Sequence, residues 1–178
     1  MIYMFLANGF EEIEALLPLD LMRRAGIEVK TVGVGGLEIT GSHGITVKAD
    51  MLDTDFADNA PECVILPGGM PGTTNLDASA IVHKALDAAL ENNALICAIC
   101  AAPMVLGKRG ILRGKKATCF PGFEGYLEGA TVGGRAVRDG QVITGVGMGA
   151  ALEFGIEIVA ALKGREAADK LFAAVLAK

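Results

Sequence analysis

Residues 94–104 read ALICAICAAPM, an apolar run that changes abruptly into small residues and a proline. The first six residues predict a buried strand that ends near Ile99. Pro103 is favoured in the first turn of a helix, so a helix is expected to begin within Ala101–Pro103. Cys100 therefore stands at a sharp strand-to-helix joint, the cysteine form of a nucleophile elbow.

This joint predicts a reactive sulfur at Cys100. Backbone N–H groups and the positive dipole end of the following helix would face the side chain. Both favour the thiolate, which is the nucleophilic form of cysteine, over the thiol. We therefore expect a lowered pKa for Cys100, with a merely packed core cysteine as the alternative interpretation.

Outward from this stretch, strand-like and helix-like segments alternate along the chain. This alternation predicts an α/β fold with a mainly parallel sheet and helices on both faces. Two turn-rich segments, residues 37–47 and 135–144, predict hairpins. The expected strands are Ile2–Ala7, Ile27–Val34, Cys63–Leu66, Ala94–Ile99 and Lys116–Cys119, and the expected helices are Glu12–Ala25, Ser79–Glu91, Gly149–Leu162 and Glu166–Leu176.

The composition limits the classes of protein to which the chain can belong. With 178 residues, of which 52% are hydrophobic, we expect one domain over residues 1–178. A net charge of -5 argues against a nucleic-acid surface. The chain has no run of about 18 apolar residues, so no membrane span is expected. Four cysteines do not form a secreted disulfide framework, so a reduced, cytoplasmic setting is expected.

Ligands of parallel α/β folds bind beyond the carboxyl ends of the strands. There the loops that follow the strands place Glu14 and Pro67-Gly68-Gly69 near Cys100. A buried, protonated Glu14 could donate a hydrogen bond to the Cys100 thiolate. The N–H groups of Gly69 and Ala101 would form an oxyanion hole, with a simple tight turn at the glycines as the alternative.

The remaining cysteines and the histidines carry weaker signals. Cys97 and Cys100 form a C-x-x-C pattern, but Cys97 lies inside the expected strand, so a packed side chain is favoured over a redox dithiol. Cys63 and Cys119 are expected in the core, with a resolving thiol as the alternative for Cys119. No metal site is predicted, because the cysteine spacings fit none and the chain has only two histidines.

Together, several motifs resemble the ThiJ/PfpI superfamily, specifically its DJ-one branch and the bacterial relatives of that branch. The resemblance implies a flavodoxin-like three-layer sandwich, related to the class I glutamine amidotransferase fold, that is usually a homodimer and uses no cofactor. It maps a reactive cysteine onto Cys100, a protonated glutamate onto Glu14 and oxyanion N–H groups onto Gly69 and Ala101. The matching stretches are residues 8–14, 22–26, 64–69 and 98–103, and more loosely 144–154.

The chain departs from the family pattern at two positions near the cysteine. The protease-like branch has a histidine directly after its cysteine, where this chain has Ala101. The human-type member has a histidine that is replaced here by Phe120, in a Cys-Phe-Pro stretch that some bacterial relatives share. A family arginine pair that holds an anion across the dimer maps onto Arg24 and onto His43.

The resemblance implies two functions that use the same residues. The first is a cofactor-free enzyme that converts reactive carbonyls such as methylglyoxal, or their thiol or amine adducts, in a glyoxalase-like or deglycase-like reaction. The alternative is an oxidative-stress sensor or redox-regulated chaperone that works by oxidation of Cys100. A role in thiamine synthesis has no support, because the chain lacks a phosphate-cradling G-x-x-x-x-G-K loop.

Overall fold

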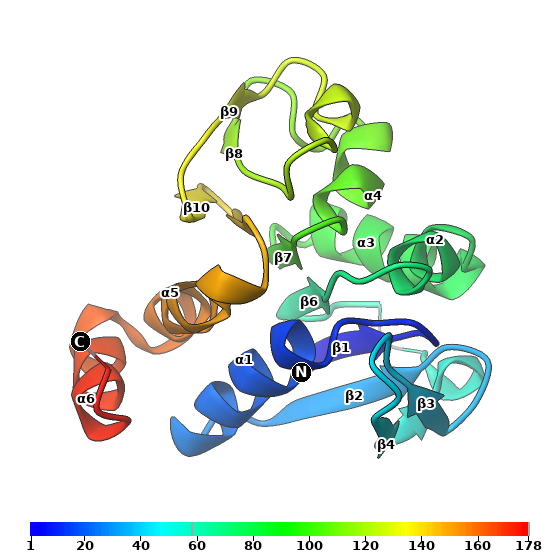
Figure 1. Ribbon diagram of the computed structural model, residues 1–178, viewed down its shortest axis with the longest axis horizontal. Coiled ribbons are helices and arrows are strands. Elements are labelled where there is room, and N and C mark those ends of the chain that lie inside the picture. Colours follow the sequence, from blue (N-terminus) through cyan, green and yellow to red (C-terminus); the bar gives the residue numbers. More distant parts are fainter. Residues whose placement is uncertain (58, 178) are drawn as a thin grey trace.

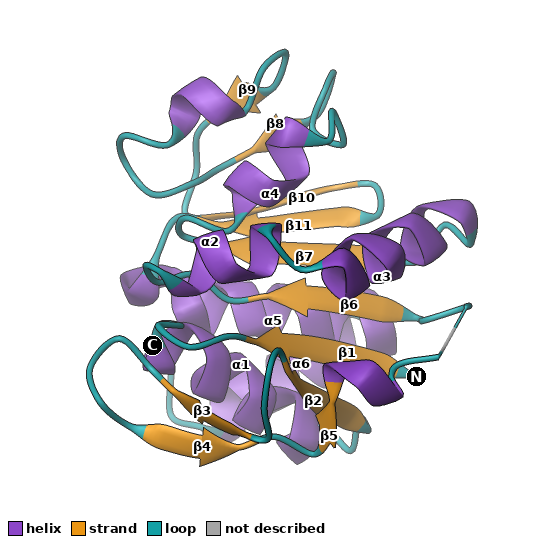
Figure 2. Cartoon of the chain, turned by 90° about the vertical axis from the view of Figure 1, so that its right-hand side faces the viewer, coloured by secondary structure: helices purple, strands orange, loops and turns teal. Residues whose placement is uncertain are grey.

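The computed structural model describes residues 1–57 and 59–177. Its central sheet has seven strands, surrounded by helices on both sides (Figures 1 and 2). The strands are β1 (Ile2–Leu6), β2 (Val29–Gly33), β5 (Met51–Leu52), β6 (Cys63–Leu66), β7 (Leu95–Ile99), β10 (Ala136–Asp139) and β11 (Val142–Gly145). The helices are α1 (Glu12–Arg24), α2 (Gly72–Asp77), α3 (Ala80–Glu91), α4 (Pro103–Lys108), α5 (Ala151–Lys163) and α6 (Arg165–Ala174).

The strand order across the sheet is β10-β11-β7-β6-β1-β2-β5. Within the described residues every pairing in this sheet is parallel except that of β10 with β11. The five central strands β2, β1, β6, β7 and β11 follow the flavodoxin-like order 2-1-3-4-5. The α/β class and the mainly parallel sheet predicted from the alternation are therefore confirmed.

Strand β1 shows how the sheet separates two apolar cores. All five of its residues are buried, and successive side chains point to opposite faces. Ile2, Met4 and Leu6 pack with α1, α5 and α6, whereas Tyr3 and Phe5 pack with α2, α3 and α4. The three layers predicted by the resemblance follow from this division (Figure 1).

Helix α1 is set by its own sequence at both ends. The Glu11 carboxylate caps its first turn by accepting a hydrogen bond of 2.8 Å from the Glu14 backbone N–H. Gly26, with a φ of 68°, follows its last turn in the left-handed conformation that glycine tolerates best. Close packing against α5 depends on Gly155, where a Cβ would lie 3.1 Å from the Cα of Pro18.

Both predicted hairpins are present. Strands β3 (Glu38–Thr40) and β4 (Thr46–Lys48) pair antiparallel outside the main sheet, and β10 pairs with β11 at its edge. The strand predicted over Lys116–Cys119 is shorter: β8 covers Lys116–Ala117 and pairs with β9 (Thr131–Val132) in a separate sheet. Strand β10 forms the edge of the main sheet next to β11, and β8 pairs outside this sheet.

Three short 3-10 helices, η1 (Asp53–Asp55), η2 (Glu124–Tyr126) and η3 (Met148–Ala150), complete the described elements. The turn η3 directly precedes α5 and lies close to the carboxyl end of β11. In the described part of the chain, none of the helices has the length and apolar character needed to cross a bilayer.

Candidate active site

Cys100 lies directly after β7 in a strained backbone conformation. Its φ is 65°, a left-handed value that residues other than glycine rarely adopt. Two hydrogen bonds of 2.8 Å hold the residue: its N–H donates to the Gly145 carbonyl, and its own carbonyl accepts from the Phe120 N–H. The elbow predicted from the sequence is therefore present, and it is fixed from both neighbouring loops.

Two backbone N–H groups point at the Cys100 sulfur. They belong to Ala101, the next residue, and to Gly69, in the loop that follows β6. Each stabilises the thiolate and lowers the pKa of Cys100. The following helix contributes less than the sequence suggested, because α4 has only six residues and begins at Pro103.

Glu14 is the buried acid beside this sulfur. It lies in the first turn of α1 with only 1% of its surface exposed, and it shares a hydrogen bond with Cys100. Its Oε2 atom also accepts a hydrogen bond of 3.1 Å from the Gly68 N–H, and the Met148 N–H donates to the same carboxylate. The carboxyl group is thus held in one orientation, facing the thiol.

The two glycines after β6 are required by this close packing. A Cβ on Gly68 would lie 2.5 Å from Glu14 Oε2 and 2.6 Å from the Cβ of Cys100. Gly69 has a φ of 89°, and a Cβ there would lie 2.3 Å from the Glu11 nitrogen. Larger residues would separate the acid from the thiol, so the glycines do more than form a turn.

Burial and charge set the proton affinities of the pair. Burial raises the pKa of Glu14 from 4.5 to about 7, and the neighbouring Glu11 carboxylate acts in the same direction. Burial also raises the pKa of the Cys100 thiol, and the charged Glu14 carboxylate raises it further, to about 12. The predicted lowering of the Cys100 pKa is therefore wrong while Glu14 is charged, because burial and Glu14 outweigh the two N–H groups.

The position of a single proton decides whether the sulfur is reactive. The Cys100 thiol and the Glu14 carboxyl group together hold two protons. After one proton is lost, the remaining proton lies either on Cys100, beside a carboxylate, or on Glu14, beside a thiolate. A neutral Glu14 no longer opposes the thiolate by its charge, and its O–H donates to the sulfur together with the N–H groups of Gly69 and Ala101. A thiolate at neutral pH therefore requires Glu14 to keep its proton.

This constellation can be compared with known proteins. Residues 1–161 match a family described as the "DJ-1/PfpI family". The chain belongs to the DJ-1/PfpI family. The sequence is 36% identical over 169 residues to the Drosophila melanogaster "Protein dj-1beta", a match that covers 90% of this chain and 88% of that protein.

Two further DJ-1/PfpI relatives extend the comparison. The Caenorhabditis elegans "Glutathione-independent glyoxalase DJR-1.2" is 30% identical over 167 residues, which are 90% of this chain and 87% of that protein. The solved structure "Toxoplasma gondii DJ-1, oxidized" has a TM-score of 0.94 at 33% identity, covering 99% of this chain and 97% of that one. The flavodoxin-like fold is thus shared over almost the whole chain.

Phe120, where the human-type DJ-1/PfpI member has a histidine, lies beside the site. Its backbone N–H bonds to the Cys100 carbonyl, and its ring approaches Gly147. The sequence reasoning missed Met148, whose N–H holds Glu14. The available signal was the glycine-rich run that begins at the last residue of β11, residues 145–149, because glycines let the backbone come close to a neighbouring group.

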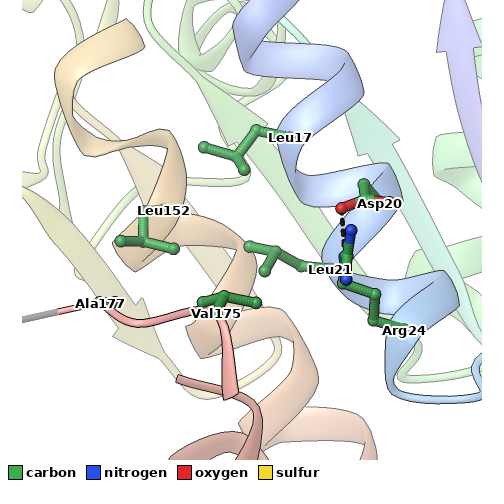
Figure 3. A pocket seen from close by; sticks show the side chains of 7 residues that line it. All are labelled: Leu17, Asp20, Leu21, Arg24, Leu152, Val175 and Ala177. Atoms are coloured by element: carbon green, nitrogen blue, oxygen red, sulfur yellow. Dashed lines mark hydrogen bonds and ion pairs between the residues drawn. The ribbon is translucent and has the colours of Figure 1, made fainter. Parts of the chain in front are cut away.

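Arg24, one of the two positions that correspond to the DJ-1/PfpI arginine pair, lies far from Cys100 within the chain. It is ten residues beyond Glu14 on α1, which is about 15 Å along a helix axis. Its Nε is 2.5 Å from the Asp20 carboxylate, and both line a cavity of about 410 Å³ between α1, α5 and the C-terminal segment (Figure 3). The structure does not bring Arg24 to the thiol of the same chain.

His43, the second of these positions, lies in the turn between β3 and β4 and is 71% exposed. Its Nδ1 is 3.0 Å from Glu12, and its backbone N–H donates to the same carboxylate at 2.8 Å. The pairing raises the pKa of His43 and lowers that of Glu12 to about 2. The ligand atoms of Glu11, Glu12 and His43 lie within 4.8 Å of one another, but these hydrogen bonds already use them, so we assign no metal.

The other cysteines lie in the cores. Cys97 is fully buried in β7, and its sulfur is 3.7 Å from that of Cys63, so its contact is with the neighbouring strand and not with Cys100. The packed interpretation of the C-x-x-C pattern is therefore confirmed. Cys119 is buried in the core on the α3 and α4 side, whereas Cys100 packs against the opposite core, which argues against Cys119 as a resolving thiol.

Proposed function

We propose that the protein is a cofactor-free enzyme that converts reactive carbonyls, such as methylglyoxal or its thiol and amine adducts, in a glyoxalase-like or deglycase-like reaction. One observation carries this proposal: Glu14 and the N–H groups of Gly69 and Ala101 all converge on the Cys100 sulfur. The name of the Caenorhabditis elegans relative, a glutathione-independent glyoxalase, supports the same reaction class.

The first step joins the sulfur to the aldehyde carbon. The Cys100 thiolate attacks, a C–S bond forms, and the electron pair of the C=O bond moves to oxygen. The N–H groups of Gly69 and Ala101 stabilise the developing oxyanion. Glu14 then gives its proton to that oxygen, which leaves a neutral hemithioacetal and a carboxylate.

The second step moves hydrogen between the two carbons of a 2-oxoaldehyde. The Glu14 carboxylate removes the C–H proton of the hemithioacetal carbon, which leaves an enediolate. Glu14 returns this proton to the adjacent carbon, and the hydroxyl proton of the former aldehyde carbon passes to the former ketone oxygen, which gives a thioester. The aldehyde carbon is thereby oxidised and the ketone carbon is reduced, so no external oxidant is needed. Water hydrolyses the thioester, which releases lactate from methylglyoxal and restores the thiol of Cys100.

The experiment that tests this proposal measures lactate formation from methylglyoxal without added thiol. Cys100→Ser should abolish turnover while the unfolding midpoint stays close to that of the wild type. Cys97→Ala is the matched control, because it removes a buried thiol outside the site and should retain turnover. Turnover by the Cys100→Ser variant would overturn the proposal.

A redox sensor is the second candidate, and it has its own observation. The same N–H groups of Gly69 and Ala101 that would hold an oxyanion can hold the oxygen atoms of a sulfinate on Cys100. Formation of the sulfinate from the thiolate consumes two equivalents of peroxide and releases two of water. Stoichiometric oxidation at Cys100 in a protein that does not convert methylglyoxal would favour this function over the enzyme.

We also propose a homodimer, as the resemblance to the DJ-1/PfpI family implies. Ile13 on α1 and Ile45 in the turn before β4 are 46% and 54% exposed. The Ile45 N–H approaches the carboxylate of Glu12, the residue that precedes Ile13, at 3.4 Å. A second copy covering this apolar surface would give twice the chain mass of 18.4 kDa in light scattering, whereas the mass of one chain would contradict it.

A further inference from the structure

Another cavity lies at the end of α4 that is farther from Cys100. Its volume is about 530 Å³, larger than that of the cavity beside Arg24. In both views α4 lies well away from β3 and β4, so a second copy at the dimer surface proposed above would leave this cavity open (Figures 1 and 2). The lining residues are Gly107, Lys108, Arg109, Gly110 and Arg113 from the end of α4 and the turn after it, and Gly125, Tyr126 and Glu128 from η2 and the residues that follow.

Close contact between α4 and η2 shapes the cavity. A Cβ on Gly107 would collide with the Tyr126 carbonyl oxygen, so a glycine is needed for this approach. The Lys108 ammonium lies over the Tyr126 ring, 5.4 Å from its centroid, and forms an ion pair of 2.6 Å with Asp77. Both contacts hold the lysine charge at the wall of the cavity.

The lining carries an excess of positive charge. Lys108, Arg109 and Arg113 contribute three cationic side chains, whereas Glu128 contributes the one carboxylate of the lining. The three cations belong to the segment KRGILRGKK, residues 108–116, which has five cationic side chains and no acidic one in a chain whose net charge is -5. A local excess of cations on an acidic protein attracts small anions to this place.

The two arginines are held differently. Arg109 is 23% exposed, its Nη1 lies 2.8 Å from His83 Nδ1, and it also pairs with Asp87, so its guanidinium is ordered before a ligand binds. Arg113 pairs with Glu128 at 2.9 Å, and these two side chains are 66% and 76% exposed. Such an exposed pair contributes at most about 1 kcal/mol, so an anion of higher charge can displace Glu128 from Arg113.

We propose that this cavity binds the phosphate group of a small phosphomonoester, held by Lys108, Arg109 and Arg113. A phosphate dianion has three terminal oxygens, which suit donors that approach from several directions, and an arginine can bind it through two parallel hydrogen bonds. The cavity is larger than a phosphate ion, so the organic part of the ligand is expected to lie against Tyr126. The site uses none of the residues around Cys100 and does not depend on the proposed function.

The test follows the backbone amide signals of Gly107, Gly110 and Gly125 by NMR in a low-salt buffer while glycerol 3-phosphate or inorganic phosphate is added. We expect glycerol 3-phosphate to shift these signals with a dissociation constant of roughly 1 mM or tighter, and inorganic phosphate to bind more weakly. The proposal would be overturned if neither compound shifts the three signals, or if inorganic phosphate binds at least as tightly as glycerol 3-phosphate.

Three variants show whether binding occurs at this cavity. Arg113→Glu should weaken the binding of glycerol 3-phosphate by about tenfold or more, because it replaces a charged donor by a carboxylate. Glu128→Gln should strengthen it by about threefold, because it removes the carboxylate that competes for Arg113. Arg165→Glu is the matched control: it makes the same change of charge at an exposed arginine on α6, paired with Glu157, and should leave the dissociation constant unchanged. Equal weakening by Arg113→Glu and Arg165→Glu would indicate unspecific attraction and would overturn the site.

Discussion

Replacing Glu14 by glutamine should change how the stability of the protein depends on pH. In the folded protein the pKa of Glu14 is about 7, above the ordinary value of 4.5. A raised pKa means that the folded state prefers the neutral acid, so Glu14 contributes stability that is complete below pH 4.5. This contribution is lost as the pH rises through 7. At about 1.4 kcal/mol for each pH unit, the loss amounts to about 3 kcal/mol.

The assay is urea unfolding of the wild type and of Glu14→Gln at a series of pH values across this window. Groups common to both proteins cancel in the difference between the two unfolding free energies. The wild type should lose about 3 kcal/mol relative to the variant between pH 4.5 and 7, because glutamine cannot ionise. A difference that stays constant across the window would refute the buried, proton-retaining Glu14 on which the mechanism depends.

Three other substitutions test separate parts of the structure. Gly68→Ala should cost about 1–3 kcal/mol and slow alkylation of Cys100, because its Cβ would collide with Glu14 and with Cys100; unchanged alkylation would contradict the close packing. Cys97→Ala should cost roughly 1 kcal/mol in urea unfolding and leave Cys100 alkylation unchanged, and slower alkylation would link Cys97 to the site. Because the pKa of Glu12 is lowered, the wild type should lose stability as the pH falls from 4.5 toward 2, and Glu12→Gln should remove this loss. Identical acid unfolding curves for the two proteins would contradict the lowered pKa of Glu12.

The sequence was sufficient where local signals determine the structure. A buried apolar run followed by small residues and a proline predicted the elbow at Cys100, and strand–helix alternation predicted the parallel sheet. Because parallel strands present their carboxyl ends at one edge of the sheet, the loops that follow β1, β6 and β7 had to meet. The proximity of Glu14, Gly69 and Cys100 follows from that rule.

The sequence was insufficient where the outcome depends on long-range packing. Nothing local indicates that the Met148 N–H reaches Glu14 or that β8 pairs with β9 outside the main sheet. The proton affinity of Cys100 depends on how deeply the thiol and its acidic neighbour are buried, which a sequence pattern does not report. The resemblance assigns Arg24 to an anion site across a dimer, and within one chain its position late in α1 carries it away from Cys100.

The most direct test of the central claim is the alkylation rate of Cys100 by iodoacetamide as a function of pH, with the site assigned by mass spectrometry. If Glu14 keeps the last proton of the pair, the thiolate appears with the first deprotonation, and the rate should rise with a midpoint well below the ordinary thiol value of about 8.5. If Cys100 keeps that proton, the rate should rise only toward 12, and the account of Cys100 as a nucleophile at neutral pH would be contradicted.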